Sequence, residues 1–244
     1  MYLADYHTHS RFSADGRASM LDMARAAAAA GLDEICFTDH FEPVELRSTT
    51  LRASFDWAGQ TAEFQDAVSR WGGPVKLRLG LELGDAPVDI PGTERLLEGR
   101  PDHDFVIGSV HMLSARFGMK DLGWLREPDE QTCYAEVEDY LEGLLKMARW
   151  GKFNVLGHLT LPLRYMNEKR GFHISMDRYG AQIEEILRTL IGNGCGIEVN
   201  TNRGAQPLPG ERWLRLYREL GGEIITLGSD AHRPAAGGRG IREG

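Results

Sequence analysis

The chain has 244 residues, of which 42% are hydrophobic and 26% are charged, as in an ordinary globular protein with material for a large core. Its net charge of −8 argues against nucleic acid as a partner, because clustered Lys and Arg bind a phosphate backbone. Three isolated cysteines fit no disulfide framework, no apolar stretch is long enough to span a membrane, and Met1 leads into "YLADYH" without a signal peptide. We therefore expect a cytoplasmic protein with neither membrane nor nucleic acid as a partner.

Short apolar runs alternate with helical patterns along the chain. Residues 2–6 form the first predicted strand, and the helical pattern that follows is capped by Ser19 and ended by Gly31. The other predicted strands are residues 34–40, 75–84, 104–111, 153–158, 195–200 and 223–232. The other predicted helices are residues 52–71, 93–98, 129–151, 183–190 and 211–220.

Seven strands separated by helices or long loops predict an α/β fold with a parallel sheet. With this many units a closed barrel is favoured, and a doubly wound open sheet is the alternative. No internal repeat, low-complexity tract or linker divides the chain. We therefore predict a single domain over residues 1–244.

Metal-binding types of side chain lie at the ends of six of the predicted strands or just after them. Two histidines one residue apart, as in "HTH", arise by chance in roughly a quarter of shuffled chains of this composition, so the pair needs partners. The candidates are His7, His9, Asp15, His40, Glu82, His111, His158, Asp230 and His232. In parallel barrels the C-terminal ends of the strands meet at one mouth, where active sites form. We therefore expect all nine side chains around one cavity.

Packing six imidazoles and three carboxylates together costs solvation and brings like charges close, and bound cations relieve both effects. Nitrogen and oxygen ligands without thiolates suit Zn, Mn or Fe. Nine ligands exceed the needs of one ion, so two or three divalent ions are expected. Glu82 can bridge two of them, with a hydroxide between the ions that attacks phosphorus or a carbonyl carbon. His103, before a strand, and His173, in a polar loop, are expected to be solvated, with His173 a remote candidate for a substrate contact.

The ordered motifs resemble a known family. "HTH", "TDH", "LELG", "SVH", "GH" and "SDAH" follow one another as in the PHP (polymerase and histidinol phosphatase) superfamily, over nearly the whole chain. The segments "DYHTHSRFSADG", "GSVHML", "GHLTLPLRY" and "IEVNT" are most similar to the monofunctional histidinol-phosphatases. The resemblance implies a distorted (β/α)7 barrel with a trinuclear metal site. It also implies hydrolysis of L-histidinol phosphate to L-histidinol and phosphate, a late step of histidine biosynthesis.

The resemblance implies a division of the nine ligands among three ions. It places His7, His9, Glu82 and Asp230 on the first ion, Glu82, His111 and His158 on the second, and Asp15, His40 and His232 on the third. Asp15 stands where some members have a histidine, a difference that can alter the identity or affinity of the third ion.

Five residues receive further roles. In the implied mechanism the ions neutralise the phosphate oxygens, and the leaving alkoxide takes a proton from Asp15, from His232 or from water on the third ion. Arg164 in "PLRY" matches an arginine near the phosphate, whereas Arg203 in "NTNRG" is a weaker match because that loop is shifted here. Asp39 is expected either to orient a neighbouring ligand or to cap the next turn.

The C-terminus departs from the family. These phosphatases continue with another helix after "GSDAHRP", whereas this chain ends in "AAGGRGIREG", which is too rich in glycine for a good helix. We expect the final barrel helix to be absent, replaced or removed by truncation. The barrel is then expected to be less stable or to be supported by a homo-oligomer.

Three other functions compete with histidinol phosphate hydrolysis. A PHP-type phosphoesterase acting on a nucleotide fits the same centre, although the acidic charge disfavours a nuclease acting on long nucleic acid. An amidohydrolase-type deacylase also begins with H-x-H, but many of those bridge their metals with a carbamylated lysine at a strand end. Here Lys76 begins its predicted strand and the other lysines lie in predicted helices or loops, so that feature is missing. A non-catalytic module on the same fold is expected to have lost ligands, and none is missing here.

Overall fold

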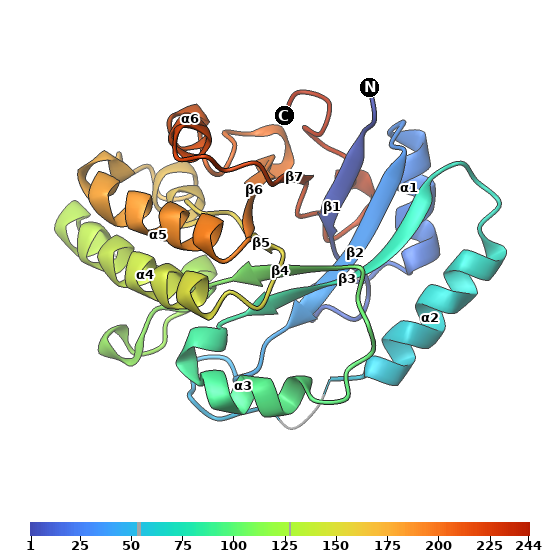
Figure 1. Ribbon diagram of the computed structural model, residues 1–244, viewed down its shortest axis with the longest axis horizontal. Helices are drawn as coiled ribbons and strands as arrows, with labels where there is room; N and C mark the ends of the chain where they lie inside the picture. Colours follow the sequence, from blue (N-terminus) through green and yellow to red (C-terminus); the bar gives the residue numbers. More distant parts are fainter. Residues whose placement is uncertain (53–54, 127) are drawn as a thin grey trace.

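The computed structural model describes residues 1–52, 55–126 and 128–244. Seven parallel strands pair with their sequence neighbours in one sheet, and the helices lie on its outside (Figure 1). The strands are β1 (Ala4–Thr8), β2 (Glu34–Phe41), β3 (Lys76–Gly84), β4 (Phe105–Ser109), β5 (Val155–Leu156), β6 (Gly196–Asn200) and β7 (Ile225–Gly228). The α-helices are α1 (Met20–Ala29), α2 (Trp57–Arg70), α3 (Ile90–Leu97), α4 (Glu130–Trp150), α5 (Gly180–Gly192) and α6 (Glu211–Glu219).

The sheet closes where the segment after β7 meets β1. Thr8 forms a parallel bridge with Ala231, and the His9 N–H donates to the Ala231 carbonyl at 2.9 Å. The Asp230 N–H donates to the His7 carbonyl at 2.8 Å. These bonds join the end of β1 to the segment after β7, so the sheet forms a nearly closed (β/α)7 barrel. The predicted barrel is confirmed, and the strand order, which never reverses direction, excludes the doubly wound sheet.

The boundaries of several elements differ from those predicted. β1 ends two residues later than predicted and β2 one residue later, so His7 lies inside its strand and His40 is no longer the last residue of its strand. β5 is limited to Val155–Leu156, because the backbone leaves the sheet at His158, whose φ is positive (21°). α2 begins five residues late because Asp56 caps it, its side chain accepting from the Gly59 N–H at 2.9 Å. Residues 53 and 54, inside the predicted helix, lie outside the described residues.

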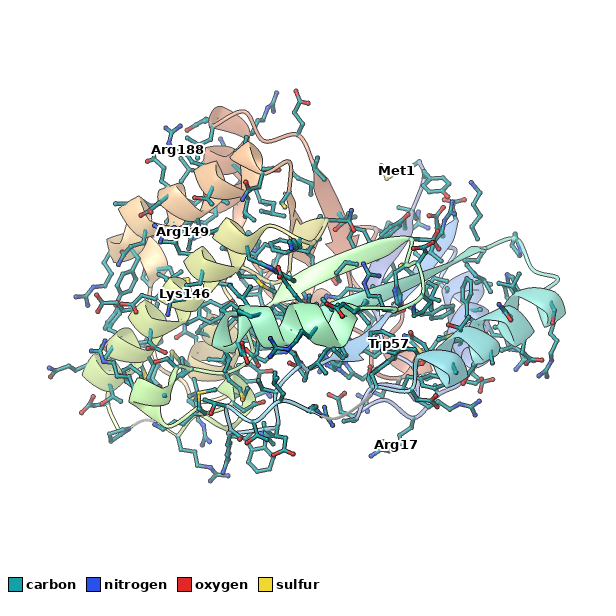
Figure 2. The ribbon with its side chains drawn as sticks, turned by 60° about the horizontal axis from the view of Figure 1, so that its bottom comes forward. Met1, Arg17, Trp57, Lys146, Arg149 and Arg188 are labelled. Atoms are coloured by element: carbon teal, nitrogen blue, oxygen red, sulfur yellow. The ribbon has the colours of Figure 1, made fainter. Side chains whose placement is uncertain are left out.

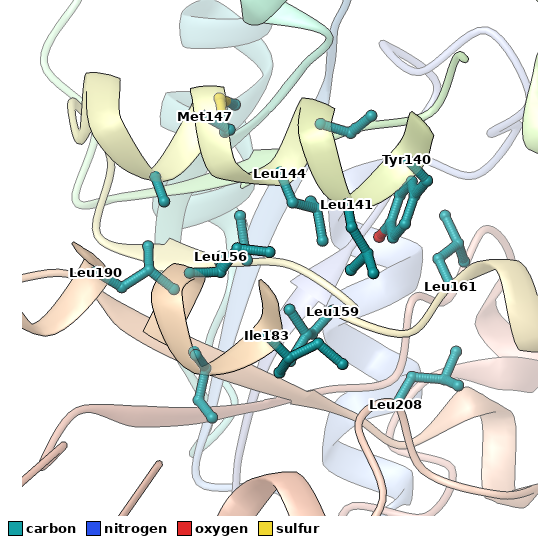
Figure 3. Packing of buried hydrophobic residues seen from close by; sticks show 14 of the residues in the cluster. Tyr140, Leu141, Leu144, Met147, Leu156, Leu159, Leu161, Ile183, Leu190 and Leu208 are labelled. Carbon is teal, nitrogen blue, oxygen red and sulfur yellow. The ribbon is translucent and has the colours of Figure 1, made fainter. Parts of the chain in front are cut away.

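The largest core lies between α4, α5 and the sheet. Figure 3 shows Tyr140, Leu141 and Leu144 of α4 facing Leu156 and Ile183, and all five side chains are fully buried. The outer faces of the same two helices carry Lys146, Arg149 and Arg188 (Figure 2). This division into a buried and a charged face reproduces the 3.6-residue pattern of the sequence. No helix in the described ranges combines the length and apolarity needed to cross a bilayer.

The chain after β7 covers α1 and β1 without an α-helix in the described residues. It makes one 3-10 turn, Pro234–Ala236, and then a series of glycine-containing turns. Ile241 is 1% exposed and packs in the core cluster that includes Met20 and Met23 of α1. The Gly238 N–H donates to Oδ2 of the buried Asp5 at 3.0 Å, so backbone as well as side chains fix the tail.

Candidate metal centre

Glu82 of β3 lies at the centre of the predicted ligands. Its Oε2 is 3.1 Å from Nε2 of His7 and 2.9 Å from Nδ1 of His40. Its Oε1 is 3.1 Å from Nε2 of His111 and 3.0 Å from Nε2 of His158. One buried carboxylate therefore faces histidines from four other strands or strand ends, as a bridging ligand does.

Asp230 joins the same cluster from the end of β7. Its Oδ1 lies 3.5 Å from Nε2 of His9 and 3.9 Å from Nε2 of His7. The φ of Asp230 is 55°, a value that few residues other than glycine adopt. The hydrogen bond from its N–H to the His7 carbonyl holds this conformation and aims the carboxylate at the two histidines.

Asp15 and His232 complete the cluster at its solvent side. Oδ2 of Asp15 is 3.0 Å from Nε2 of His232, and Oδ1 is 3.8 Å from Nε2 of His40. Nε2 of His232 also lies 3.4 Å from Nε2 of His40. The His9 ring stacks on both of these histidines, with centroids 4.0 and 4.3 Å apart. The structure thus brings all nine predicted ligands together.

The donor atoms fit bound cations. Four buried atoms that point into the cluster make no hydrogen bond within the described part of the chain: Nε2 of His7, Nε2 of His9, Nδ1 of His40 and Oε2 of Glu82. An unsatisfied buried polar atom costs about 1–3 kcal/mol, so such a set is expected only where another species binds it. Ligand atoms of His7, Glu82 and His158, and of His40, Glu82 and His111, lie within 4.8 Å of one another.

The charge states of the cluster also suit metal ions. Burial lowers the pKa of His9, and the neighbouring histidines His232 and His40 lower it further, so its imidazole is neutral and free to ligate. Burial raises the pKa of Glu82, but the surrounding histidines outweigh burial and hold that pKa well below its usual range. For His7 burial lowers the pKa, yet the carboxylates of Glu198 and Glu82 raise it well above its usual value. The carboxylates around His7 therefore favour a positive charge at this position, as a bound cation would supply.

Three acidic residues that contact the candidate ligands are absent from the predicted site residues. Glu198 of β6 accepts from Nδ1 of His7 at 2.6 Å, and Glu42 accepts from Nδ1 of His111 at 2.8 Å. Asp85 accepts from the His111 N–H at 2.8 Å. The sequence feature that could have indicated Glu198 is its charged side chain inside the otherwise apolar strand segment "GIEV". Such partners orient metal-binding imidazoles and raise their basicity.

Asp39 reaches a ligand through a serine. Its Oδ1 accepts from Oγ of Ser13 at 2.8 Å, and that hydroxyl lies 2.9 Å from Nδ1 of His9. Both oxygens of Asp39 also accept from Ser10, one from its N–H and one from its hydroxyl. Asp39 thus contacts a candidate ligand through Ser13, as one of the two alternatives expected, and it fixes the turn after β1 and not the turn that follows it in the sequence.

The two predicted phosphate-binding arginines differ in their surroundings. Arg164, in a single π-helical turn (Arg164–Glu168), is 6% exposed, and Nη1 donates to Oδ2 of Asp230 at 2.6 Å. Its Nε and Nη2 donate to the side-chain oxygens of Asn202 and Asn200 at 2.7 and 2.8 Å. Arg203 is half-exposed, with Nη2 4.0 Å from the same oxygen of Asp230. Both line the cavity.

The two histidines expected outside the cluster do lie outside it. His173 is exposed, as expected. His103 is half-buried, which corrects the expectation that it is solvated: Nδ1 accepts from Nη1 of Arg100 at 2.9 Å, and Nε2 lies 3.3 Å from Oε1 of Gln60. Burial, together with the charge of Arg100, lowers the pKa of His103 to about 4.

A cavity of about 1000 Å³ lies over the cluster. Asp15, Glu82 and His158 line it at the cluster, and Arg164, Lys169 and Arg203 add positive charge to its wall. A cavity of this size holds a small molecule, and the cations favour one that carries an anionic group.

Together, a nearly closed α/β barrel and a histidine- and carboxylate-rich centre at the C-terminal ends of its strands define a metal-dependent hydrolase. The chain belongs to the PHP domain family, whose model matches residues 5–202.

Named relatives resemble the chain over most of its length. It is 32% identical over 240 residues to a protein of Deinococcus radiodurans named probable histidinol-phosphatase, covering 95% of this chain and 87% of that one. A probable histidinol-phosphatase of Thermotoga maritima is 30% identical over 244 residues, covering 99% and 89%. The solved structure of Lactococcus lactis histidinol phosphate phosphatase, complexed with zinc, L-histidinol and phosphate, matches with a TM-score of 0.76 and 27% identity, covering 95% and 87%.

Proposed function

We infer that this chain is a metal-dependent histidinol-phosphatase, which hydrolyses L-histidinol phosphate to L-histidinol and phosphate in histidine biosynthesis. The observation that carries this inference is the buried cluster around Glu82, in a chain at least 30% identical to two proteins named probable histidinol-phosphatase over nearly its whole length. The zinc, L-histidinol and phosphate in the Lactococcus structure support the same substrate and products.

We propose that the nine clustered side chains hold three divalent ions. The central position of Glu82 supports a ligand shared between ions, and the approach of Asp15, His40 and His232 supports a separate site at the cavity. Zinc is the first candidate, because the Lactococcus enzyme contains it, and Mn and Fe suit the same ligand types. Bound ions supply positive charge for the phosphate oxygens and activate water for the attack.

Arg164 and Arg203 are proposed to bind the phosphate. The bonds of Arg164 to Asp230 and two asparagines fix the plane of its guanidinium before the substrate arrives. A fixed guanidinium suits the bidentate geometry of a phosphate. Arg203 lines the same cavity but is half-exposed and less restrained, so its proposed contact with the phosphate is the weaker of the two.

We propose that Asp15 and His232 together return the proton to the leaving oxygen. Burial raises the pKa of Asp15, but its hydrogen bond with His232 and the charges of nearby histidines outweigh burial and lower that pKa below its ordinary value. The ionised Asp15, with Oδ2 3.0 Å from Nε2 of His232, can therefore orient a water molecule that carries the proton to the leaving oxygen. Both residues line the cavity, where the leaving oxygen can accept this proton.

We propose that residues 1–244 act as one hydrolase domain, since a single sheet contains all seven strands. The substrate is tested by following phosphate release from L-histidinol phosphate, from a panel of nucleotides and from a phosphodiester. We expect selective release of phosphate from L-histidinol phosphate, and we expect Asp230→Asn to abolish it. The control Glu34→Gln neutralises a buried carboxylate at the start of β2, the end away from His40, and should retain the activity. Faster release from a nucleotide would keep the metal centre and overturn the substrate.

A further inference from the structure

Glu198 lies behind the metal centre and contacts two of its histidines at once. It belongs to β6 and is 1% exposed. Its Oε1 accepts from Nδ1 of His7 at 2.6 Å, and its Oε2 accepts from the N–H of His158 at 2.7 Å. No Lys or Arg of the described chain lies within 4.0 Å of this carboxylate, so the two histidines are its closest partners besides Asn200.

The two histidines connect Glu198 with Glu82. Nε2 of His7 faces Oε2 of Glu82 at 3.1 Å, and Nε2 of His158 faces Oε1 of Glu82 at 3.0 Å. Each oxygen of Glu198 thus holds one histidine, and each of these histidines approaches a different oxygen of Glu82.

The bond to His7 determines which ring nitrogen is free. A carboxylate only accepts hydrogen bonds, so the short contact requires a proton on Nδ1 of His7. The lone pair of the neutral ring is then on Nε2, the buried atom that makes no hydrogen bond in the described residues and points into the cluster. The other tautomer would place a proton where an ion must bind.

The bond to His158 acts on the backbone. His158 has a φ of 21°, which costs free energy in a residue with a side chain. The Glu198 carboxylate holds this peptide N–H and thereby the direction in which the imidazole leaves β5. Space for the carboxylate depends on a glycine in β7, because a Cβ at Gly228 would collide with Glu198 and with the Cβ of His7.

We propose that Glu198 is a positioning residue that sets the metal affinity of this centre through His7 and His158. The inference rests on the proposed metal centre but not on the identity of the substrate. Replacing one carboxylate oxygen by an amide group leaves only one acceptor for two donors. In Glu198→Gln either His7 turns to the wrong tautomer or His158 loses its backbone restraint.

The test measures Zn²⁺ binding without substrate. Metal-free protein is titrated with Zn²⁺ in competition with a chromophoric chelator, for the wild type, Glu198→Gln and Glu198→Asp. Glu34→Gln is the matched control, since it neutralises a buried strand carboxylate outside the cluster. We expect Glu198→Gln to raise at least one Zn²⁺ dissociation constant about 10–100-fold, with Glu198→Asp between it and the wild type. Unchanged constants in folded Glu198→Gln would overturn the proposal.

A second measurement needs no variant of Glu198, so it tests the proposal even if Glu198→Gln does not fold. Long-range ¹H–¹⁵N spectra of the zinc-loaded chain report the tautomer of His7, assigned by difference from His7→Asn. We expect a proton on Nδ1, and a proton on Nε2 would overturn the proposal. Neither measurement involves a phosphoester, so a wrong substrate would leave this inference standing, and its failure would leave the phosphatase assignment standing.

Discussion

Arg164 and Asp230 form a buried ion pair whose carboxylate faces two ways. Oδ2 of Asp230 accepts from Nη1 of Arg164 at 2.6 Å, while Oδ1 lies 3.5 Å from Nε2 of His9. The aspartate therefore connects the proposed phosphate-binding guanidinium to the proposed metal ligands. Because Asp230 contacts both Arg164 and the proposed metal ligands, a substitution of Arg164 is expected to lower the rate of hydrolysis more than a substitution of a peripheral substrate contact does.

Replacing Arg164 by Lys should lower kcat/KM at least about 100-fold. An ammonium group cannot donate to Asp230, Asn200 and Asn202 while also presenting a planar pair of donors to phosphate. Arg203→Lys is the comparison, and a loss below about tenfold is expected because Arg203 is half-exposed and 4.0 Å from its nearest carboxylate oxygen. Steady-state kinetics on L-histidinol phosphate measures both, and equal losses would contradict the distinction.

Asp15→Asn and His232→Asn should each reduce kcat about 100-fold, and the double variant should lose little more. Two residues that share one proton-transfer step act as a unit, so their effects are not additive. p-Nitrophenyl phosphate separates this role from metal binding, since its leaving group departs without a proton. We expect a much smaller loss with that substrate, and an equal loss with both would assign the residues to metal binding alone.

His103 should contribute to the pH dependence of stability. Its pKa in the folded chain is about 4, below the ordinary 6.5, so the unfolded chain takes up the proton first as the pH falls. Stability is therefore complete above about pH 6.5 and decreases towards pH 4, by up to about 2–3 kcal/mol. Urea unfolding at pH 7 and pH 4.5 should show a smaller pH effect in His103→Gln than in the wild type. The matched variant of the exposed His173, His173→Gln, should leave the pH effect unchanged.

The glycine-rich tail should contribute to the core despite lacking a helix. Ile241→Ala removes a side chain that is 1% exposed and should cost about 2–4 kcal/mol of unfolding free energy. Ile224→Ala, at a position 47% exposed, should cost less than about 1 kcal/mol. A separate expectation concerns the final barrel helix, which the described residues lack after β7; without it the barrel should be less stable or dependent on a homo-oligomer. Sedimentation and thermal melts test it: we expect a low melting midpoint or an oligomer, and a monomer with a single high midpoint would contradict the expectation.

The gathering of the nine candidate ligands was predictable because each of them lies at or near the end of a predicted strand. A histidine after an apolar run reveals its place at the barrel mouth from a few residues of sequence, as His40 and His111 do. The partners behind the ligands were not predictable in this way. Glu198 meets His7 across 191 positions of sequence, and only the closure of the barrel brings the two together. The burial of His103 is not readable from its neighbours in the sequence either, because Gln60 approaches it from 43 positions away, although Arg100 belongs to the same loop.

The most direct test of the account is to add divalent ions stepwise to metal-free protein while counting bound ions and following phosphate release from L-histidinol phosphate. The account predicts no release without ions and full release only once the Glu82 cluster is filled, with neither the ions nor the activity recovered in Asp230→Asn. Release by protein that holds no ions, or none by protein that holds its full complement, would contradict it.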